Sequence, residues 1–561
     1  QELDAHLQQE ADDYVAQGFS REEATRRARL KLGSTTRIRE DVWQWNSLAF
    51  EGILRDLSYS TRTLLRTPGF AIMAIVVMAL GIGANTALFS VVHSVLLKPL
   101  PFTDPDRLVM LYERSVDTNY PFNIIAPGVY AEWKKDAKSF QSMAIFGSGS
   151  YNLSGDSGQL PERIEALRAS ADFFSTLGVN PAYGRMFDSS DDQPQAEATV
   201  VLSWGLWKRR FGGNPSIIGT KILLDGSRYT VIGVTPAWFA YPDAQTEVWT
   251  AFHHEIPPKD LTALDNHSFN AIARLKPGVS LEQALSEIDN ISRHLREQYG
   301  AKLPAISLGA NMRLLLEDVI HDFKTPLYVL LAATGCVLLI ACLNVANLLI
   351  ARAAARRKEV AIRAALGGSR WRLIREQLSE TVLLCAAGGS LGLVFAYFAV
   401  RWLVGVRQDI AREEAIRMDW VAIVFTVGVT LLSALLAGLI PAFSTSGKAS
   451  LLGLQESSRS HTGAQGKTRL RKLLLSLEVA LTVVLLIAAG LLLKSYEKLR
   501  SSDMGCVTDN VLTMRLSLPE TNYAETTQRA AFFEELLRRL RSLPGVSAAA
   551  LINVVPGQGY G

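Results

Sequence analysis

Five long apolar runs dominate the hydrophobic pattern of the chain. Each run supplies the roughly 20 apolar residues that a helix needs to cross a bilayer. The first run begins about 70 residues into the chain and is too long for a cleaved signal peptide. Buried helices of a soluble protein are the alternative, and five such runs in one chain argue against it. The pattern therefore predicts transmembrane helices in residues 67–97, 325–351, 381–400, 420–447 and 473–493.

Charged residues flank these runs unevenly and predict an orientation. Residues 352–375 contain eight Lys or Arg and one Glu, and residues 444–472 contain six Lys or Arg and one Glu. Because cytoplasmic loops carry an excess of Lys and Arg, we expect both segments to lie in the cytoplasm. The N-terminus is then also cytoplasmic, and the segment between the first two helices lies outside.

We therefore predict a polytopic α-helical membrane protein with an extracytoplasmic mixed α/β domain inserted between the first two transmembrane helices. The predicted order is a cytoplasmic helical prefix (1–48), an amphipathic lead-in with helix one (49–98), the outer domain (99–324), helix two (325–351), a cytoplasmic loop (352–377), helix three (378–403), helix four (420–443), a cytoplasmic linker (444–472), helix five (473–493) and the start of a second outer domain (494–561).

The outer segment has the composition of a soluble α/β domain. Two strand-like runs around Asp225 and Gly226 predict a hairpin over residues 221–234. Helical periodicity after the turn at Pro277 and Gly278 predicts a helix over residues 279–300. Shorter helices are expected near residues 172–177 and 204–211. A domain attached to one transmembrane helix at each end is suited to bind something outside the membrane and to transmit helix motion.

Composition excludes several classes of protein. With 561 residues, 48% hydrophobic and 20% charged, the chain is neither disordered nor collagen-like and is long enough for more than one domain. Its net charge of +4 gives no reason to expect a nucleic-acid partner. Three of the four cysteines lie in apolar runs, so no disulfide framework is expected. Because the chain starts at Gln1 and stops within a soluble-looking region, we interpret it as part of a longer protein.

Signals for catalysis or metal binding in the outer domain are weak. A metal site could be imagined at His253, His254, Asp265 and His267, but a strand sends adjacent side chains to opposite faces. Ser203 lacks the GxSxG context of a nucleophile elbow. We expect no catalytic residue, metal or cofactor in this chain. An acidic cluster lacks the spacing of a calcium loop and is interpreted as a solvated turn, formed by Asp188, Asp191 and Asp192.

The basic loop after the second apolar run carries two partial apolar stripes, separated by Gly367 and Gly368. This pattern predicts two short amphipathic helices on the inner membrane surface. Such a segment could simply contact anionic lipid. We favour a coupling element that docks on a cytoplasmic partner and passes the partner's motion to helices two and three.

Residues 461–468 partly match the phosphate-binding pattern GxxxxGK[ST], through Gly466, Lys467 and Thr468. The required first glycine is His461, no strand precedes the segment, and the fifth apolar run follows within a few residues. A phosphate-binding loop needs a strand before it and a helix after it. We therefore interpret the match as chance and expect no ATP binding by this chain.

Some polar and small residues lie inside the apolar runs. Glu478 either reaches the inner interface or is buried with a functional role. Asn344 and Asn347 are expected to hydrogen-bond to neighbouring helices. The small residues that permit close helix contact are Gly81, Gly83 and Ala87.

The chain also contains a partial internal repeat. The first and fifth apolar runs are each preceded by basic residues, end near Lys98 or Lys494, and are followed by an extended run. Residues 532–551 then predict an amphipathic helix, a Leu-Pro-Gly turn and a strand-like run. A second outer domain therefore starts in the C-terminal segment.

These segments together resemble the MacB/FtsX-like permeases of ABC systems, specifically the duplicated permeases described from Acidobacteria. The resemblance covers almost the whole chain. The segments that carry it are LDAHLQQEADDYVAQGFSREEATRRARLKLGS, RTPGFAIMAIVVMALGIGANTALFSVVHSVLLKPLPF, VVLSWGLWKRRFGGNPSIIGTKILLDGSRYTVIGVTP and NVANLLIARAAARRKEVAIRAALGGSRWRLIREQLSE.

The resemblance implies a MacB-like periplasmic core domain and a separate ABC ATPase dimer, which would bind ATP and Mg. Closure of that dimer would be transmitted through the basic loop to the outer domains, since such permeases are described as transmitting force rather than passing cargo through a channel. The implied ATPase-contact residues are Glu359, Ile362, Arg363, Gly367 and Arg370.

The resemblance also implies a place in the bacterial inner membrane and further partners. These are membrane lipid, a membrane-fusion adaptor or extracytoplasmic effector, and a second permease half in the same chain or in a homodimer. The MacB exporter carries a fused ATPase that this sequence lacks, so antibiotic efflux is not implied. The functions left open are mechanical export or extraction, an FtsX-like signalling scaffold, and a membrane-anchored enzyme, which the missing catalytic set disfavours.

Overall fold

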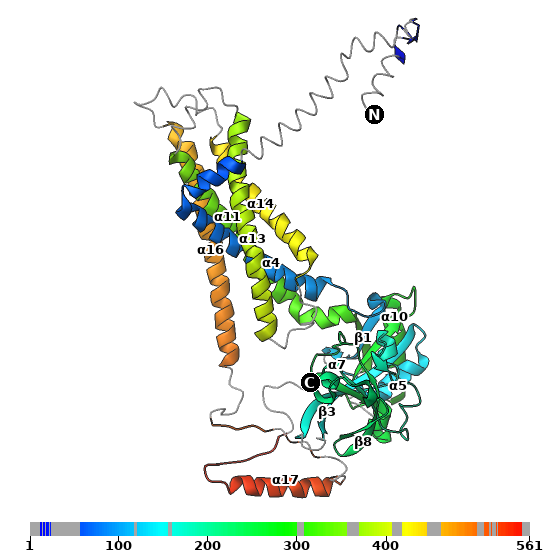
Figure 1. The fold of residues 1–561 in the computed structure, drawn as a ribbon. Helices are drawn as coiled ribbons and strands as arrows, with labels where there is room; N and C mark the ends of the chain where they lie inside the picture. The colour runs from blue at the N-terminus through cyan, green and yellow to red at the C-terminus, as the bar shows by residue number, and fades with distance from the viewer. Residues whose placement is uncertain are drawn as a thin grey trace. The chain divides into compact units, whose positions relative to one another are not determined.

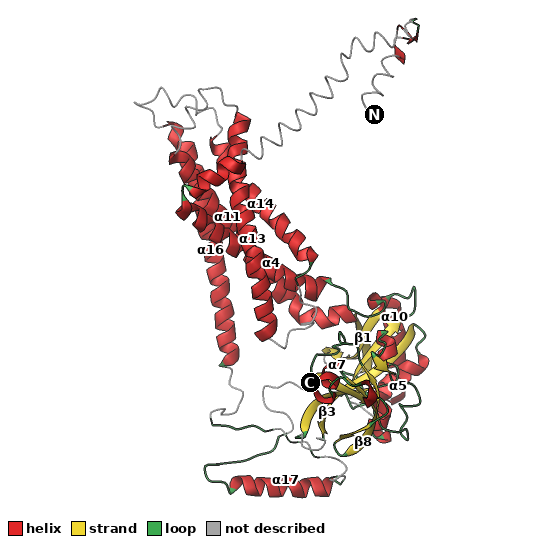
Figure 2. Ribbon diagram, in the orientation of Figure 1, coloured by secondary structure: helices red, strands yellow, loops and turns green. Residues whose placement is uncertain are grey.

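The computed structural model contains two compact units. One comprises Gln1–Val91, Val329–Gly405 and Met418–Leu492, and the other comprises Val92–Tyr328, Val406–Arg417 and Leu493–Gly561. In the described part of the chain, every strand lies in the second unit (Figure 2). The structure describes residues 12–13, 15–16, 18, 20–21, 23, 57–116, 120–154, 160–299, 308–355, 370–406, 418–445, 462–501, 510–514, 516, 518, 523 and 525–552.

Five helices in the described residues are long and apolar enough to cross a membrane, as the hydrophobic pattern predicted. They are labelled in Figure 1. The second helix begins upstream of its predicted run, and acidic residues in its first turn suit a helix N-terminus. The five helices are α4 (Pro68–Val92), which continues as the π-helical segment η1 (His93–Leu97), α11 (Leu315–Ala355), α13 (Arg370–Val406), α14 (Trp420–Thr445) and α16 (Thr462–Arg500).

Four of these helices share one apolar core. Met78 and Ile82 of α4 pack there with residues of α11, α13 and α14. Gly83 lets α4 approach α13 closely, because a β-carbon on Gly83 would lie 2.8 Å from the carbonyl oxygen of Gly392. A β-carbon on Gly81 would lie 3.2 Å from Leu338 of α11. The prediction that Gly81 and Gly83 permit close helix contact is therefore confirmed.

The second unit is built on one mixed eleven-stranded sheet with the order β11-β1-β10-β3-β4-β9-β6-β8-β5; β2 pairs with β1, and β7 pairs with β3 and β8. The pairs β4–β9 and β6–β8 are parallel and the other pairs are antiparallel. The strands are β1 (Leu108–Ser115), β2 (Tyr120–Asn123), β3 (Phe140–Leu153), β4 (Glu162–Ala169), β5 (Tyr183–Gly184), β6 (Thr199–Leu202), β7 (Lys221–Leu224), β8 (Ser227–Val234), β9 (Thr246–Ala251), β10 (Asn270–Leu275) and β11 (Leu308–Leu314).

Helices cover this sheet and enclose three apolar cores. Val109 and Leu111 of β1 contribute to a core with α5 and α10, whereas Leu108 and Met110 belong to a second core with α6 and the start of α11. This alternation is the two-residue period of a strand. A third core lies under α7. The helices of this unit are η2 (Pro105–Arg107), α5 (Pro127–Asp136), α6 (Phe173–Leu177), α7 (Trp204–Phe211), η3 (Pro215–Ile217), α8 (Phe252–Glu255), α9 (Pro258–Leu261), α10 (Leu281–Tyr299) and α17 (Thr526–Arg541).

The predicted local elements of the sheet domain are confirmed. The predicted hairpin is β7–β8, and its turn residues Asp225 and Gly226 both have positive φ, as a type I′ turn requires. Helices α6, α7 and α10 lie where the periodicity placed them. Ser203 caps α7, because its Oγ accepts the backbone N–H of Leu206 at 3.0 Å.

The C-terminal segment agrees with its prediction only in part. The amphipathic helix is present as α17. The strand-like run after it is not a strand, because residues 546–552 pair with no other described strand. Backbone groups there lack the ladder partner that a strand needs.

Candidate functional site

Arg352 lies near the end of α11, directly before the basic loop. Its guanidinium forms an ion pair with Glu380 of α13, and each side chain is only 11% exposed. The guanidinium also donates to Thr67 Oγ1 at 2.8 Å and to the carbonyl oxygen of Thr63 at 3.3 Å. Its central carbon lies 4.6 Å from the centre of the Phe70 ring. One side chain therefore joins α11, α13, the start of α4 and the helical residues before it.

The local sequence places the two charges at this point. Arg352 is the first charged residue after the apolar run of α11, and Glu380 is the last before that of α13. A buried guanidinium is tolerated only when its charge is paired and its N–H groups are bonded. The hydroxyl oxygens of Ser60 and Ser379 lie 2.9 Å apart beside this pair. Charged and neutral contacts together fix α13, at Ser379 and Glu380, next to residues 57–65.

The ATPase-contact residues implied by the resemblance belong to the loop between these helices. Glu359, Ile362, Arg363 and Gly367 lie outside the described residues. Arg370 is the first residue of α13, and its side chain is outside them too. Their role stays a prediction. The sequence argument did not identify Arg352 and Glu380 as a pair, although opposite charges on either side of one loop were the available signal.

Helix α11 follows the last strand of the sheet directly in the chain. β11 ends at Leu314, and α11 begins at the next residue, runs for 41 residues and contains Pro326. β11 pairs with β1 from Val109↔Leu314 to Ser115↔Leu308. The Tyr112 hydroxyl donates to Asp318 Oδ1. The strand that follows the first apolar helix and the strand that precedes the second are therefore hydrogen-bonded to each other.

Two of the three histidines considered as metal ligands, His253 and His267, each pair with a different carboxylate. His253 Nδ1 lies 2.9 Å from Asp192 Oδ2, and His267 Nε2 lies 2.9 Å from Glu113 Oε2. Among the residues described by the structure, no group of three or more His, Cys, Asp or Glu side chains is arranged to hold a metal ion. Both pairs join distant chain segments, which indicates a structural role.

The acidic cluster corrects the sequence interpretation as a solvated turn. Asp188 is exposed, but the side chains of Asp191 and Asp192 are each only 5% exposed. Asp191 pairs with both terminal nitrogens of Arg185. Burial raises the pKa of Asp192, but hydrogen bonds and charge from His253 outweigh it and leave this pKa below 3.8. These carboxylates tie chain segments together because buried charges require partners.

Asn347 corrects a second expectation. Its amide nitrogen and oxygen are buried and have no hydrogen-bond partner in the described structure. Other residues make the polar contacts between helices. Asn85 Nδ2 donates to the carbonyl oxygen of Thr334 at 2.8 Å, and Thr86 Oγ1 lies 3.0 Å from Thr426 Oγ1.

The partial phosphate-binding match lies in a helix. Gly466, Lys467 and Thr468 belong to the first turns of α16, so they do not form the loop between a strand and a helix that such a site requires. Glu478 is half-buried further along α16, and its role stays a prediction.

The fold and the site define a class of protein, in which long apolar helices accompany a mixed α/β domain and a buried ion pair lies beside a basic loop. Two family models match the chain. The MacB-like periplasmic core domain matches residues 71–291, and the FtsX-like permease C-terminal domain matches residues 331–449. Together they cover more than half of the chain, which belongs to the MacB/FtsX-like family of ABC transporter permeases. Membership of the duplicated acidobacterial group stays a prediction.

Relatives share part of the chain. It is 25% identical over 243 residues to the macrolide export ATP-binding/permease protein MacB of Burkholderia thailandensis, covering 41% of this chain and 35% of that protein. The MacB protein of Salmonella typhi is 24% identical over 244 residues, covering 43% and 36%. The matched segments thus span about a third of the length of these relatives.

Solved structures of sheet domains are also similar to this chain. The periplasmic region of MacB from Actinobacillus actinomycetemcomitans is 14% identical, with a TM-score of 0.28, and the match covers 39% of this chain and 92% of that one. The extracellular domain of the ABC-type transporter YknZ from Gram-positive bacteria is 16% identical, with a TM-score of 0.25, and the match covers 34% and 95%.

Proposed function

We propose that this chain is an ABC transporter permease subunit that couples ATP hydrolysis by a separate ATPase dimer to movements of its outer domain. The work done would be export or extraction of a substrate. The observation that carries the proposal is the continuity of α11, which starts at the sheet and ends at the Arg352–Glu380 pair beside the basic loop. Membership of the permease family implies an ABC ATPase as partner.

The contacts around Arg352 support this coupling physically. A displacement of the loop would act on α11 and α13 together, because a buried ion pair joins them. The bonds from Arg352 to Thr63 and Thr67 would extend that displacement to the start of α4. At the sheet, β1 and β11 would respond as one ladder. Such a displacement would be a sliding of packed helices between two arrangements, and a partner that binds one arrangement more tightly would shift the population toward it.

The charge distribution supports an orientation for this mechanism. The basic loop, the linker over residues 444–472 and the N-terminus would face the cytoplasm of a bacterium, with the sheet domain outside the inner membrane. ATP and Mg would be bound by the partner ATPase, and this chain would be the non-catalytic subunit.

A pull-down of the full-length protein from its native membrane tests the proposal. The loop variant carries Glu359→Arg and Arg363→Glu, and a matched control carries Glu456→Arg and Arg459→Glu in the linker, with the same net charge. We expect an ABC ATPase to co-purify with wild type and control but not with the loop variant. Absence of an ATPase from all three would refute the permease function, and equal recovery in all three would refute the loop as its contact.

The FtsX-like match over residues 331–449 favours one second candidate, a transmembrane signalling scaffold that activates an extracytoplasmic partner. The same pull-down distinguishes the two functions. A membrane-fusion adaptor among the captured proteins would support export, whereas a cell-wall hydrolase or a sensor would support signalling.

A further inference from the structure

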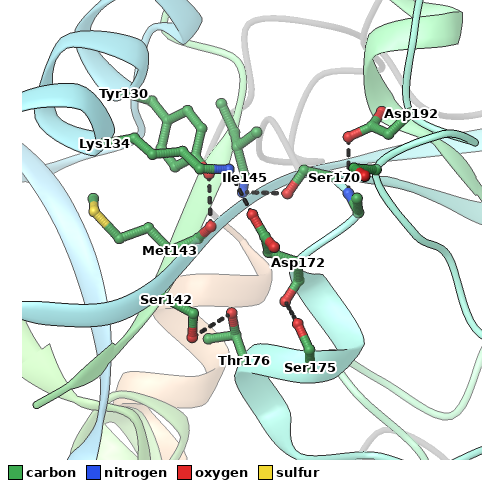
Figure 3. A network of polar contacts seen from close by, with 12 residues as sticks. Tyr130, Lys134, Ser142, Met143, Ile145, Ser170, Asp172, Ser175, Thr176 and Asp192 are labelled. Carbon is green, nitrogen blue, oxygen red and sulfur yellow. Dashed lines mark hydrogen bonds and ion pairs between the residues drawn. The ribbon is translucent and has the colours of Figure 1, made fainter.

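A cavity of about 270 Å³ lies beside α5 in the sheet domain. Apolar and aromatic side chains form most of its wall, and its polar groups are basic. Tyr130 is 3% exposed and its hydroxyl donates to the carbonyl oxygen of Met143 at 2.9 Å, so this part of the wall is rigid (Figure 3). The lining residues that matter here are Tyr130, Lys134, Lys135, Phe252, His253 and Leu261.

The opposite wall belongs to the connection between β9 and β10, residues 252–269, which we call the strap. It contains α8 and α9. Gly128 at the start of α5 lets the strap lie against the helix, because a β-carbon there would be 2.7 Å from the carbonyl oxygen of Thr262. The backbone N–H of Gly128 donates to the carbonyl oxygen of Ala263 at 2.9 Å.

A histidine bonded to a buried carboxylate holds each end of the strap. At the first end, Asp192 accepts the backbone N–H of His253 at 2.7 Å and contacts its Nδ1 at 2.9 Å. At the second end, Glu113 is 2% exposed, contacts His267 Nε2 at 2.9 Å and accepts the backbone N–H of Ala126 at 2.7 Å. Because Asp192 engages Nδ1, the nitrogen of His253 left for a ligand is Nε2.

The two lysines of the cavity remain available to an anion. Lys134 contacts Asp172 at 2.6 Å (Figure 3), and Lys135 contacts Glu132 at 3.2 Å. Both ion pairs are substantially exposed, and exposed ion pairs contribute only about 0–1 kcal/mol. A ligand carboxylate can therefore compete for these ammonium groups, whereas the buried carboxylates of Asp192 and Glu113 remain bonded to the histidines of the strap.

We propose that this cavity binds a small ligand consisting of an apolar ring or chain with one carboxylate, and that the strap forms one wall of the site. Tyr130, Phe252 and Leu261 contact the apolar part, and Lys134 and Lys135 contact the carboxylate. Binding at this site does not depend on the proposed coupling to an ATPase.

Fluorine NMR of the full chain in lipid nanodiscs tests the site with 4-fluorobenzoate as the probe. The matched neutral probe is 4-fluorobenzamide, which has the same ring and no charge. We expect the benzoate to bind at least about fivefold more tightly than the benzamide, because its carboxylate accepts a charge-assisted hydrogen bond from a lysine, and such a bond is stronger than one to a neutral amide. Equal line broadening for both probes would overturn the assignment of the ligand class.

Three variants locate the binding. Ala131→Trp fills the cavity and should abolish the broadening by benzoate. Lys134→Gln with Lys135→Gln should remove the preference for benzoate over benzamide, whereas the control Lys221→Gln, which changes another exposed ion pair (2.8 Å to Glu197), should preserve it. Binding that persists in Ala131→Trp would refute the cavity as the site.

Discussion

Replacing Glu380 with glutamine should loosen the helical unit next to the basic loop. The substitution preserves the size of the side chain but removes the Glu380 charge that pairs with the buried Arg352 guanidinium. Both side chains are 11% exposed, so water compensates only partly. Arg352 retains its bonds to Thr63 and Thr67 and its contact with Phe70, and these contacts should keep the helices in register in the variant.

The size of the effect follows from these contacts. Removing one partner of a buried ion pair costs about 3–5 kcal/mol in soluble proteins, while single hydrogen bonds between membrane helices average about 0.6 kcal/mol. Because the amide of glutamine can still accept one hydrogen bond, we expect Glu380→Gln to lower the free energy of unfolding by about 2–3 kcal/mol. Arg352→Gln also loses the contacts with Thr63, Thr67 and Phe70 and should cost about 1 kcal/mol more.

Equilibrium unfolding of the purified chain in mixed micelles measures these values in a double-mutant cycle. The double variant should be about as stable as Arg352→Gln alone, which corresponds to a coupling energy of about 2–3 kcal/mol, equal to the cost of Glu380→Gln. Ser379→Ala is the matched control, because it removes a neutral hydrogen bond from the adjacent position of α13 and should cost about 0.5–1.5 kcal/mol. A coupling energy under about 0.5 kcal/mol, typical of an exposed pair, would refute the interpretation of Arg352–Glu380 as the junction between the helices.

Two further perturbations test the packing of each unit. Gly392→Leu should destabilise the helical unit by about 1–3 kcal/mol or more, since a β-carbon at this position would lie 2.9 Å from the carbonyl oxygen of Ala79. Gly335→Leu is the control in the same unfolding assay, because nothing lies within 4 Å of a β-carbon there. Equal losses of stability in the two variants would contradict the close approach of α4 and α13. The hydrogen bond with Glu113 raises the pKa of His267 above 6.5, so the pair's contribution to stability is complete below pH 6.5 and falls as pH rises through the raised pKa. Chemical denaturation from about pH 5.5 to 8.5 should show this loss in wild type and not in His267→Gln; parallel pH profiles would count against the ion pair.

The elements predicted correctly from the sequence are those decided by neighbouring residues. Asp225 and Gly226 specify the hairpin turn through their own φ angles. The periodicity that predicts α10 lies within one continuous segment. Two of the wrong interpretations depended on distant residues. Asp192 is buried because His253, far along the chain, reaches it. Asn347 has no hydrogen-bond partner in the described structure, and polar contacts between the helices are made by other side chains, such as Asn85.

The same distinction explains what was predicted of α11. Its apolar middle indicated a transmembrane helix, because about 20 apolar residues suffice to cross a bilayer. The helix has 41 residues, and tertiary contacts specify both of its ends. At the sheet, Leu315 is fully buried and Asp318 accepts the hydroxyl of Tyr112. At the loop, Arg352 is held by Glu380. Under the coupling proposed above, variants at the two ends of α11, rather than in its apolar middle, should separate stability from coupling.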